Sequence, residues 1–187
     1  MSPSSADRAS AHELEAAFVA KAEEELRYAD GVAEGGEAVP WSGDVFAEVF
    51  LVKGDPGPAE VAGGPALSGP DGQAARKALE ALGFDPASVF ASVARPEPDL
   101  EREALYARLR IQVETVDPYT VVALDRVAAE FVCAAFGLRA FRPGRPAHAH
   151  GRVFVAVDGL EESLADAGLK QRVWRQLKTL SPRPPSF

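Results

Sequence analysis

Cysteine is nearly absent from this chain of 187 residues, since Cys133 is the only one and lies in the apolar string FVCAAF. One cysteine cannot form an internal disulfide or a site that needs several cysteine ligands, such as an iron–sulfur cluster. We therefore expect no metal, no iron–sulfur cluster and no other cofactor. A buried apolar thiol is the simplest role for Cys133.

Long hydrophobic runs are also missing, and none approaches the length that a membrane span requires. The first ten residues, MSPSSADRAS, contain no basic stretch followed by an apolar one, so no signal peptide is visible. The sequence predicts a cytoplasmic protein with no membrane contact.

Basic residues are outnumbered, with 20 basic against 28 acidic side chains and a net charge of −8. This balance argues against tight nonspecific binding to DNA, because nucleic-acid binders usually present a basic surface. A local basic patch remains possible in one run of arginines and histidines, for which a solvated loop is the alternative. The run consists of Arg139, Arg142, Arg145, His148, His150 and Arg152.

Several catalytic and phosphate-binding signatures are absent as well. The chain has no G-x-x-x-x-G-K-[ST], no G-x-G-x-x-G after a strand, no H-E-x-x-H, no G-x-S-x-G and no paired-cysteine motif. The P-loop NTPase, Rossmann dehydrogenase, zincin and α/β-hydrolase classes are thereby disfavoured.

What the sequence does contain is one unusual stretch, Val45 to Gly72. Its apolar beginning, Val45 to Val52, is typical of a buried strand. The following residues, Gly54 to Gly72, are so rich in glycine and proline that we expect no regular structure there. A long loop after a buried strand and before a helix is a common ligand site in α/β folds, although a plain surface loop is the alternative.

Strands and helices alternate along the rest of the chain. This order predicts a three-layer α/β/α sandwich with a four-stranded, mostly parallel sheet. The expected strands are 45–52, 89–93, 119–124 and 153–157. The expected helices are 11–28, 73–82, 99–116, 125–136 and 168–180. Leu14, Phe18 and Leu26 form the apolar face of the first helix, and the helix at 125–136 has Asp125 as its N-cap and ends at Gly137. We expect a disordered N-terminus at 1–10, an N-terminal helix and linker at 11–40, a domain at 41–181 and a Pro-rich tail at 182–187.

Five segments, in this order, carry a family resemblance. They are FLVKGDPGPAEVAGGPALSGPDG, KALEALGF, VFASVARP, VETVDPYTVVALDRVAAEFVCAAFG and GRVFVAVDGLEESLADAGLKQRVWRQLKTL. Between Val45 and Leu180 the chain resembles a diverged uracil-DNA glycosylase superfamily domain, nearest the bacterial and archaeal branch that usually holds an iron–sulfur cluster. The cysteines of that cluster are absent. The resemblance implies DNA repair by base flipping and hydrolysis of an N-glycosidic bond.

The resemblance also implies site residues in the glycine- and proline-rich loop. The family's G-E-x-P-G-like motif positions water near the sugar C1′, and here Pro56-Gly57 matches its end. Gly54 falls on the acid of that motif, with Asp55 displaced by one residue, so Asp55 is the expected water-positioning acid. Leu67 lies where the family has the aromatic residue that stacks on uracil.

Outside the loop, Ser92 matches the polar strand residue that reads base edges. The segment whose histidine supports the leaving uracil falls at Asp158, which is either a second catalytic carboxylate or merely the end of a strand. His148 and His150 are candidate substitute donors, with a solvated loop position as the alternative.

Two functions follow as hypotheses. One is a uracil-DNA glycosylase-like enzyme of altered or reduced activity, with Asp55 orienting water and Ser92 contacting the base. The other is a non-catalytic pseudoenzyme that keeps the cleft as a surface for nucleic acid or a protein partner. Glycosidic cleavage needs a donor near the base, water or negative charge near C1′ and a stacked pocket, and this sequence departs from the family at all three.

Overall fold

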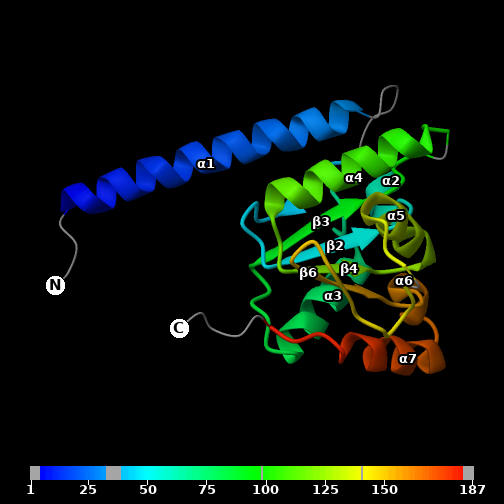
Figure 1. Cartoon of the computed structure of the whole chain (residues 1–187). Helices are drawn as coiled ribbons and strands as arrows, with labels where there is room; N and C mark the ends of the chain where they lie inside the picture. Colours follow the sequence, from blue (N-terminus) through cyan, green and yellow to red (C-terminus); the bar gives the residue numbers. More distant parts are fainter. Residues whose placement is uncertain (1–4, 33–38, 98, 140, 183–187) are drawn as a thin grey trace.

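The computed structural model describes residues 5–32, 39–97, 99–139 and 141–182, and these build an α/β domain around one mixed sheet (Figure 1). The sheet has six strands in the order β1-β3-β2-β4-β6-β5. The strands are β1 (Ser42–Gly43), β2 (Val49–Lys53), β3 (Val89–Val93), β4 (Thr120–Ala123), β5 (Ala147–Ala149) and β6 (Arg152–Ala156).

The four inner strands are parallel to one another, and each outer strand is antiparallel to its neighbour. The α/β class is thus confirmed, but the prediction of a four-stranded sheet is wrong. Both missed strands are short edge strands. Neither β1 nor β5 carries the apolar run by which a buried strand is recognised, since their sequences are SG and AHA.

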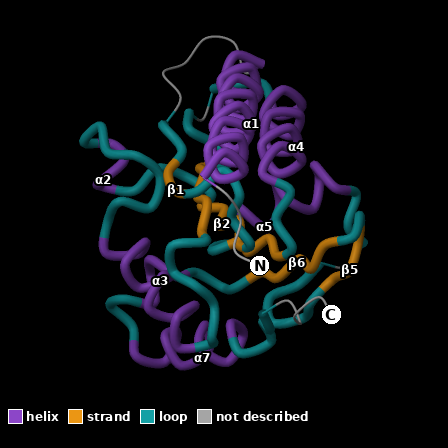
Figure 2. Tube along the Cα trace, turned by 90° about the vertical axis from the view of Figure 1, so that its left-hand side faces the viewer, coloured by secondary structure: helices purple, strands orange, loops and turns teal. Residues whose placement is uncertain are grey.

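Helices cover both faces of the sheet (Figures 1 and 2). One apolar core lies between the sheet and α1, α4 and α5, and a second lies between the sheet and α3, α6 and α7. The helices are α1 (Ser5–Val32), α2 (Pro58–Val61), α3 (Pro70–Ala81), α4 (Arg102–Val116), α5 (Arg126–Phe136), α6 (Leu160–Ser163) and α7 (Ala167–Leu177).

Local sequence explains several of these boundaries. Strand β3 has the bounds that its apolar string VFASV predicts, and all of its side chains are buried. Helix α5 begins where Asp125 accepts a hydrogen bond from the Ala128 N–H, and it ends at Gly137, whose φ of 62° suits glycine. Both ends of α5 were predicted correctly.

Helix α1 differs from its prediction at both ends. It begins at Ser5, so the expectation of disorder is wrong for 5–10. Three ranges with predictions lie outside the described residues, namely 1–4 of the expected disordered N-terminus, 33–38 of the expected linker and 183–187 of the expected tail. Of its expected core residues only Leu26 is buried, and Leu14 and Phe18 are 59% and 55% exposed. The first half of the helix extends past the sheet, which leaves those two side chains without a core to enter (Figure 1).

The second half of α1 is held by a buried polar network. The Arg108 guanidinium of α4 donates to Asp30 Oδ1 of α1 at 2.9 Å and to the carbonyl of Val93 at 2.8 Å. Gln112 also donates to Asp30 Oδ1, at 3.1 Å, and accepts a hydrogen bond from the Ser92 hydroxyl at 2.8 Å. These bonds join α1, α4 and β3.

Within the described part of the chain, no helix is long and apolar enough to cross a membrane.

Candidate functional site

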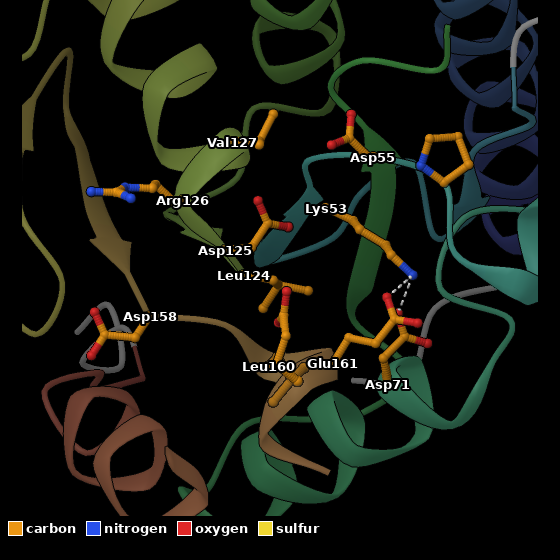
Figure 3. A pocket seen from close by; sticks show the side chains of 12 residues that line it. Lys53, Asp55, Asp71, Leu124, Asp125, Arg126, Val127, Asp158, Leu160 and Glu161 are labelled. Carbon is orange, nitrogen blue, oxygen red and sulfur yellow. Dashed lines mark hydrogen bonds and ion pairs between the residues drawn. The ribbon is translucent and has the colours of Figure 1, made fainter. Parts of the chain in front are cut away.

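A cavity of about 210 Å³ lies at the carboxyl ends of β2, β4 and β6 (Figure 3). From β2 the chain passes to β3 on one side and then returns to β4 on the other, so the cavity lies where the strand order reverses. Open α/β sheets bind their ligands at such a point. The lining residues are Lys53, Asp55, Pro56, Asp71, Leu124, Asp125, Arg126, Val127, Asp158, Leu160, Glu161 and Glu162.

Lys53 ends β2 and brings its ammonium group among three carboxylates. Lys53 Nζ lies 2.6 Å from Asp71 Oδ2, 2.8 Å from Glu161 Oε2 and 3.3 Å from Glu60 Oε2. Lys53, Glu60 and Asp71 are all buried. Burial lowers the pKa of Lys53, but hydrogen bonds to Asp71 and Glu161 and the charge of Glu60 outweigh it, and the pKa is raised above its ordinary 10.5.

Glu60 also fixes the loop that follows β2. Its Oε2 accepts a hydrogen bond from the Gly57 N–H at 2.9 Å, and its Oε1 accepts one from the Leu67 N–H at 2.8 Å. A Cβ at Gly57 would lie only 2.4 Å from Lys53 Nζ, so this position must lack a side chain for the lysine to reach its partners. Glu60 and Lys53 together convert part of the glycine- and proline-rich segment into ordered structure.

Asp125 caps α5 and binds the β2 loop as well. Its Oδ2 accepts a hydrogen bond from the Gly54 N–H at 2.7 Å, and its Oδ1 accepts one from the Ala128 N–H at 2.8 Å. A Cβ at Gly54 would lie 2.4 Å from Asp125 Oδ1, which explains why glycine stands there. Burial raises the pKa of Asp125, and the amide hydrogen bonds oppose this only in part.

The raised pKa of Asp125 predicts how its contribution to stability depends on pH. The folded state holds the proton more tightly than the unfolded state, whose pKa is near 3.8. The contribution of Asp125 should therefore be greatest below pH 3.8 and fall as the pH rises through the folded pKa. The total fall is about 1.4 kcal/mol for each pH unit that separates the folded pKa from the unfolded one. We expect the free energy of unfolding of the wild type, minus that of Asp125→Asn, to decrease in urea titrations as the pH rises above 3.8. A constant or increasing difference would contradict this.

Asp55 follows Gly54 and is held by a bidentate ion pair. Arg95 Nε donates to Asp55 Oδ1 at 2.6 Å, and Arg95 Nη2 donates to Oδ2 at 2.8 Å. Hydrogen bonding to Asp55 raises the pKa of Arg95. The planar fork of the guanidinium fixes the orientation of the carboxylate on the cavity wall. Because the Asp55 side chain is 47% exposed, water can reach it.

Asp158 lies on the opposite side of the cavity, just after β6 (Figure 3). Its Oδ2 accepts a hydrogen bond from Gln176 Nε2 at 2.8 Å and lies 3.7 Å from Arg172 Nη1. Asp158 therefore faces α7 as well as the cavity.

The other predicted site residues divide into two groups. Pro56 lines the cavity, and Gly54 and Gly57 lie next to two residues that line it, Asp125 and Lys53. Leu67 and Ser92 do not line it. Leu67 is 2% exposed, and Ser92 is fully buried with its hydroxyl bound to Gln112 on the α4 side of the sheet.

His148 and His150 lie at the other end of the sheet. They line a separate cavity of about 390 Å³ together with Tyr119 and Arg152, beside the beginning of β6, whereas Asp158 follows its end. His150 Nε2 lies 3.2 Å from the carbonyl oxygen of Phe136. The antiparallel pairing of β5 with β6 fixes this position, so the structure does not bring either histidine to the cavity of Asp55.

Most residues that line the cavity were not predicted as site residues, among them Lys53, Asp71, Asp125 and Glu161. A lysine at the end of an apolar strand, as at Lys53, is a signal that the sequence shows. Asp71 and Glu161 are far from Lys53 in the sequence, and no pattern there indicates that they contact it. Asp125 was expected only as a helix cap. In the part of the chain described here, no three His, Cys, Asp or Glu side chains are placed to hold a metal ion.

No protein-family model matches this chain, and a search of curated proteins finds no relative.

Proposed function

We propose that this chain is a diverged, uracil-DNA glycosylase-like hydrolase that binds a damaged base of DNA at the cavity and cleaves its N-glycosidic bond. The observation that carries the proposal is the place of Asp55. The residue that the resemblance assigns to water positioning lines a cavity at the strand-order reversal, with Pro56 beside it and Asp158 opposite.

The proposed chemistry begins with a water molecule on Asp55. Arg95 uses one lone pair on each carboxylate oxygen of Asp55, and a second lone pair on each remains available to a water proton. The sugar becomes oxocarbenium-like as the base departs, and the surrounding carboxylates favour that positive charge. Lys53 does not cancel this effect, because its ammonium group is already paired with Asp71, Glu161 and Glu60.

The test is an excision assay with oligonucleotides that carry uracil, hypoxanthine or xanthine in single- and double-stranded form. Protein is added in excess, and abasic sites are revealed by alkali. We expect Asp55→Asn to lower the single-turnover rate by about 10²- to 10⁴-fold, the usual contribution of a positioned base. Asp85→Asn is the matched control, because Asp85 is an exposed loop aspartate that caps the Ala87 N–H outside the cavity.

No cleavage of any base by stoichiometric wild-type protein would refute the hydrolase. Equal rates for Asp55→Asn and the wild type would remove Asp55 from the mechanism.

A second candidate is a non-catalytic member of the fold that binds nucleic acid or a protein partner. The burial of Ser92 favours it, because that side chain cannot contact a base while it is bound to Gln112. Fluorescence anisotropy with labelled uracil-containing and matched normal oligonucleotides separates the two candidates. Binding without cleavage would support the binding module, whereas neither binding nor cleavage would direct the search to a protein partner.

A further inference from the structure

Asp125 is a carboxyl group on the cavity wall for which the hydrolase mechanism above has no use. It is positioned by backbone amides, those of Gly54 in the β2 loop and of Val127 and Ala128 in α5. The residue after Gly54 is Asp55, so Asp125 lies beside the loop that carries the water-positioning acid. Figure 3 shows both carboxyl groups at the cavity, on neighbouring strand ends.

The two carboxyl groups have opposite surroundings. Asp55 is paired with the charge of Arg95, whereas the hydrogen bonds to Asp125 come from uncharged amides. Burial is the largest cause of the raised pKa of Asp125, and the charge of Glu162, on α6, further disfavours its ionisation. The other charged groups on this cavity wall are Lys53, Asp71, Arg126, Asp158 and Glu161, and Arg95 lies close enough for the charge of Asp125 to affect its pKa.

Two carboxyl groups that share a cavity but have opposite surroundings can divide the work of glycosidic hydrolysis. We propose that Asp125 is the general acid of this site and delivers a proton to the departing base, a role that rests on the proposed hydrolase function. It would supply the donor that His148 and His150 cannot supply from the far end of β6.

Atoms and electrons balance in the proposed step. The oxygen of water bonds to C1′ of the sugar while the bond between C1′ and the base nitrogen breaks, and the electron pair of that bond stays with the base. Asp125 gives its proton to the base, which leaves neutral. Asp55 takes a proton from the attacking water. Transfer of that proton from Asp55 to Asp125 through solvent restores both groups.

The amide hydrogen bonds of Asp125 do not block this role. The two carboxyl oxygens offer about four acceptor positions, and the three amides use three of them, so one remains for the acidic proton. The amides fix the plane of the carboxyl group, since one comes from the β2 loop and the others from α5. A donor fixed in this way needs little reorganisation during the reaction.

The test compares Asp125→Asn with Asp166→Asn in single-turnover excision across a range of pH. Asp166 is the matched control because it caps α7, also 11 residues long, through a 2.8 Å bond from the Leu169 N–H and does not line the cavity. Asparagine retains an oxygen that can cap Ala128. We expect Asp125→Asn to excise uracil about 10²- to 10³-fold more slowly and Asp166→Asn to match the wild type.

Two further readouts separate a proton donor from a structural cap. The wild-type rate should fall at high pH as Asp125 ionises, and this limb should disappear in Asp125→Asn. On 5-fluorouracil, a base that leaves readily without a proton, the rate of Asp125→Asn should be close to that of the wild type. If Asp125→Asn does not fold, Asp125→Ser keeps a capping hydroxyl and serves the same comparison.

The assignment of Asp125 as proton donor is overturned if Asp125→Asn keeps the rate and pH profile of the wild type. It is also overturned if the variant loses as much rate on 5-fluorouracil as on uracil. Either result leaves the proposed hydrolase function intact. Absence of cleavage by the wild type on every base would instead refute the proposed function itself, and the proton donor with it.

Discussion

Lys53→Met should destabilise the protein by about 3–5 kcal/mol, because it leaves buried carboxylates without their cation. Glu60 and Asp71 are only 5% and 3% exposed, and each is an ion-pair partner of Lys53. Methionine fills a similar volume, so the loss reports the charge rather than a cavity. The free energy of unfolding from urea titrations monitored by circular dichroism measures it.

Lys170→Met is the control for this change, because Lys170 is an exposed lysine of α7 and its replacement should alter stability by no more than about 0.5 kcal/mol. The double variant Lys53→Met with Asp71→Asn should regain part of the loss, since one of the two buried carboxylates is then neutral. If Lys53→Met is as stable as Lys170→Met, the buried cluster does not stabilise the fold.

Arg108→Met should cost a similar amount, about 3–5 kcal/mol, because it leaves the Val93 carbonyl without its donor and removes the cation that is paired with Asp30. Asp30 then keeps only the hydrogen bond from Gln112. The Arg108 side chain is fully buried, and burial lowers its pKa against the opposing effect of Asp30. The loss should be accompanied by release of α1, because Asp30 is the residue through which this network holds that helix. Limited proteolysis within α1 and urea titration measure the two effects.

Arg110→Met is the matched control on the same helix. Arg110 is exposed and pairs with Glu114 one turn away, an interaction worth about 0.3–0.5 kcal/mol. Equal stability and equal protease sensitivity of the two variants would show that the Arg108 network does not anchor α1.

Much of the fold follows from local sequence. The apolar string at Val89–Val93 and the capping residues Asp125 and Gly137 act within a few residues of their own position, and the structure confirms all three. Alternation of strands and helices likewise led to the correct α/β class.

Local sequence gave a wrong start for the first expected strand, because buried apolar residues can lie in a turn as well as in a strand. Val45 and Ala47 are buried as a strand would require, yet they lie in a turn in which Asp44 accepts hydrogen bonds from the N–H groups of Phe46 and Ala47. The strand therefore begins later, at Val49. Helix α2 was not predicted because its N-cap residue, Gly57, has no side chain that could cap the helix. The capping contact is instead the hydrogen bond from the Gly57 N–H to the Glu60 carboxylate.

The sequence by itself determined the α/β class, most inner strands and the place of the glycine- and proline-rich loop, because periodicity and capping depend on neighbours in the chain. Only the tertiary structure decided the site. It buried Ser92 beneath α4, placed the two histidines at the far end of β6, and gathered Lys53, Asp71 and Glu161 into one cluster. Strand order and register bring distant segments together, and that arrangement depends on the packing of the whole sheet.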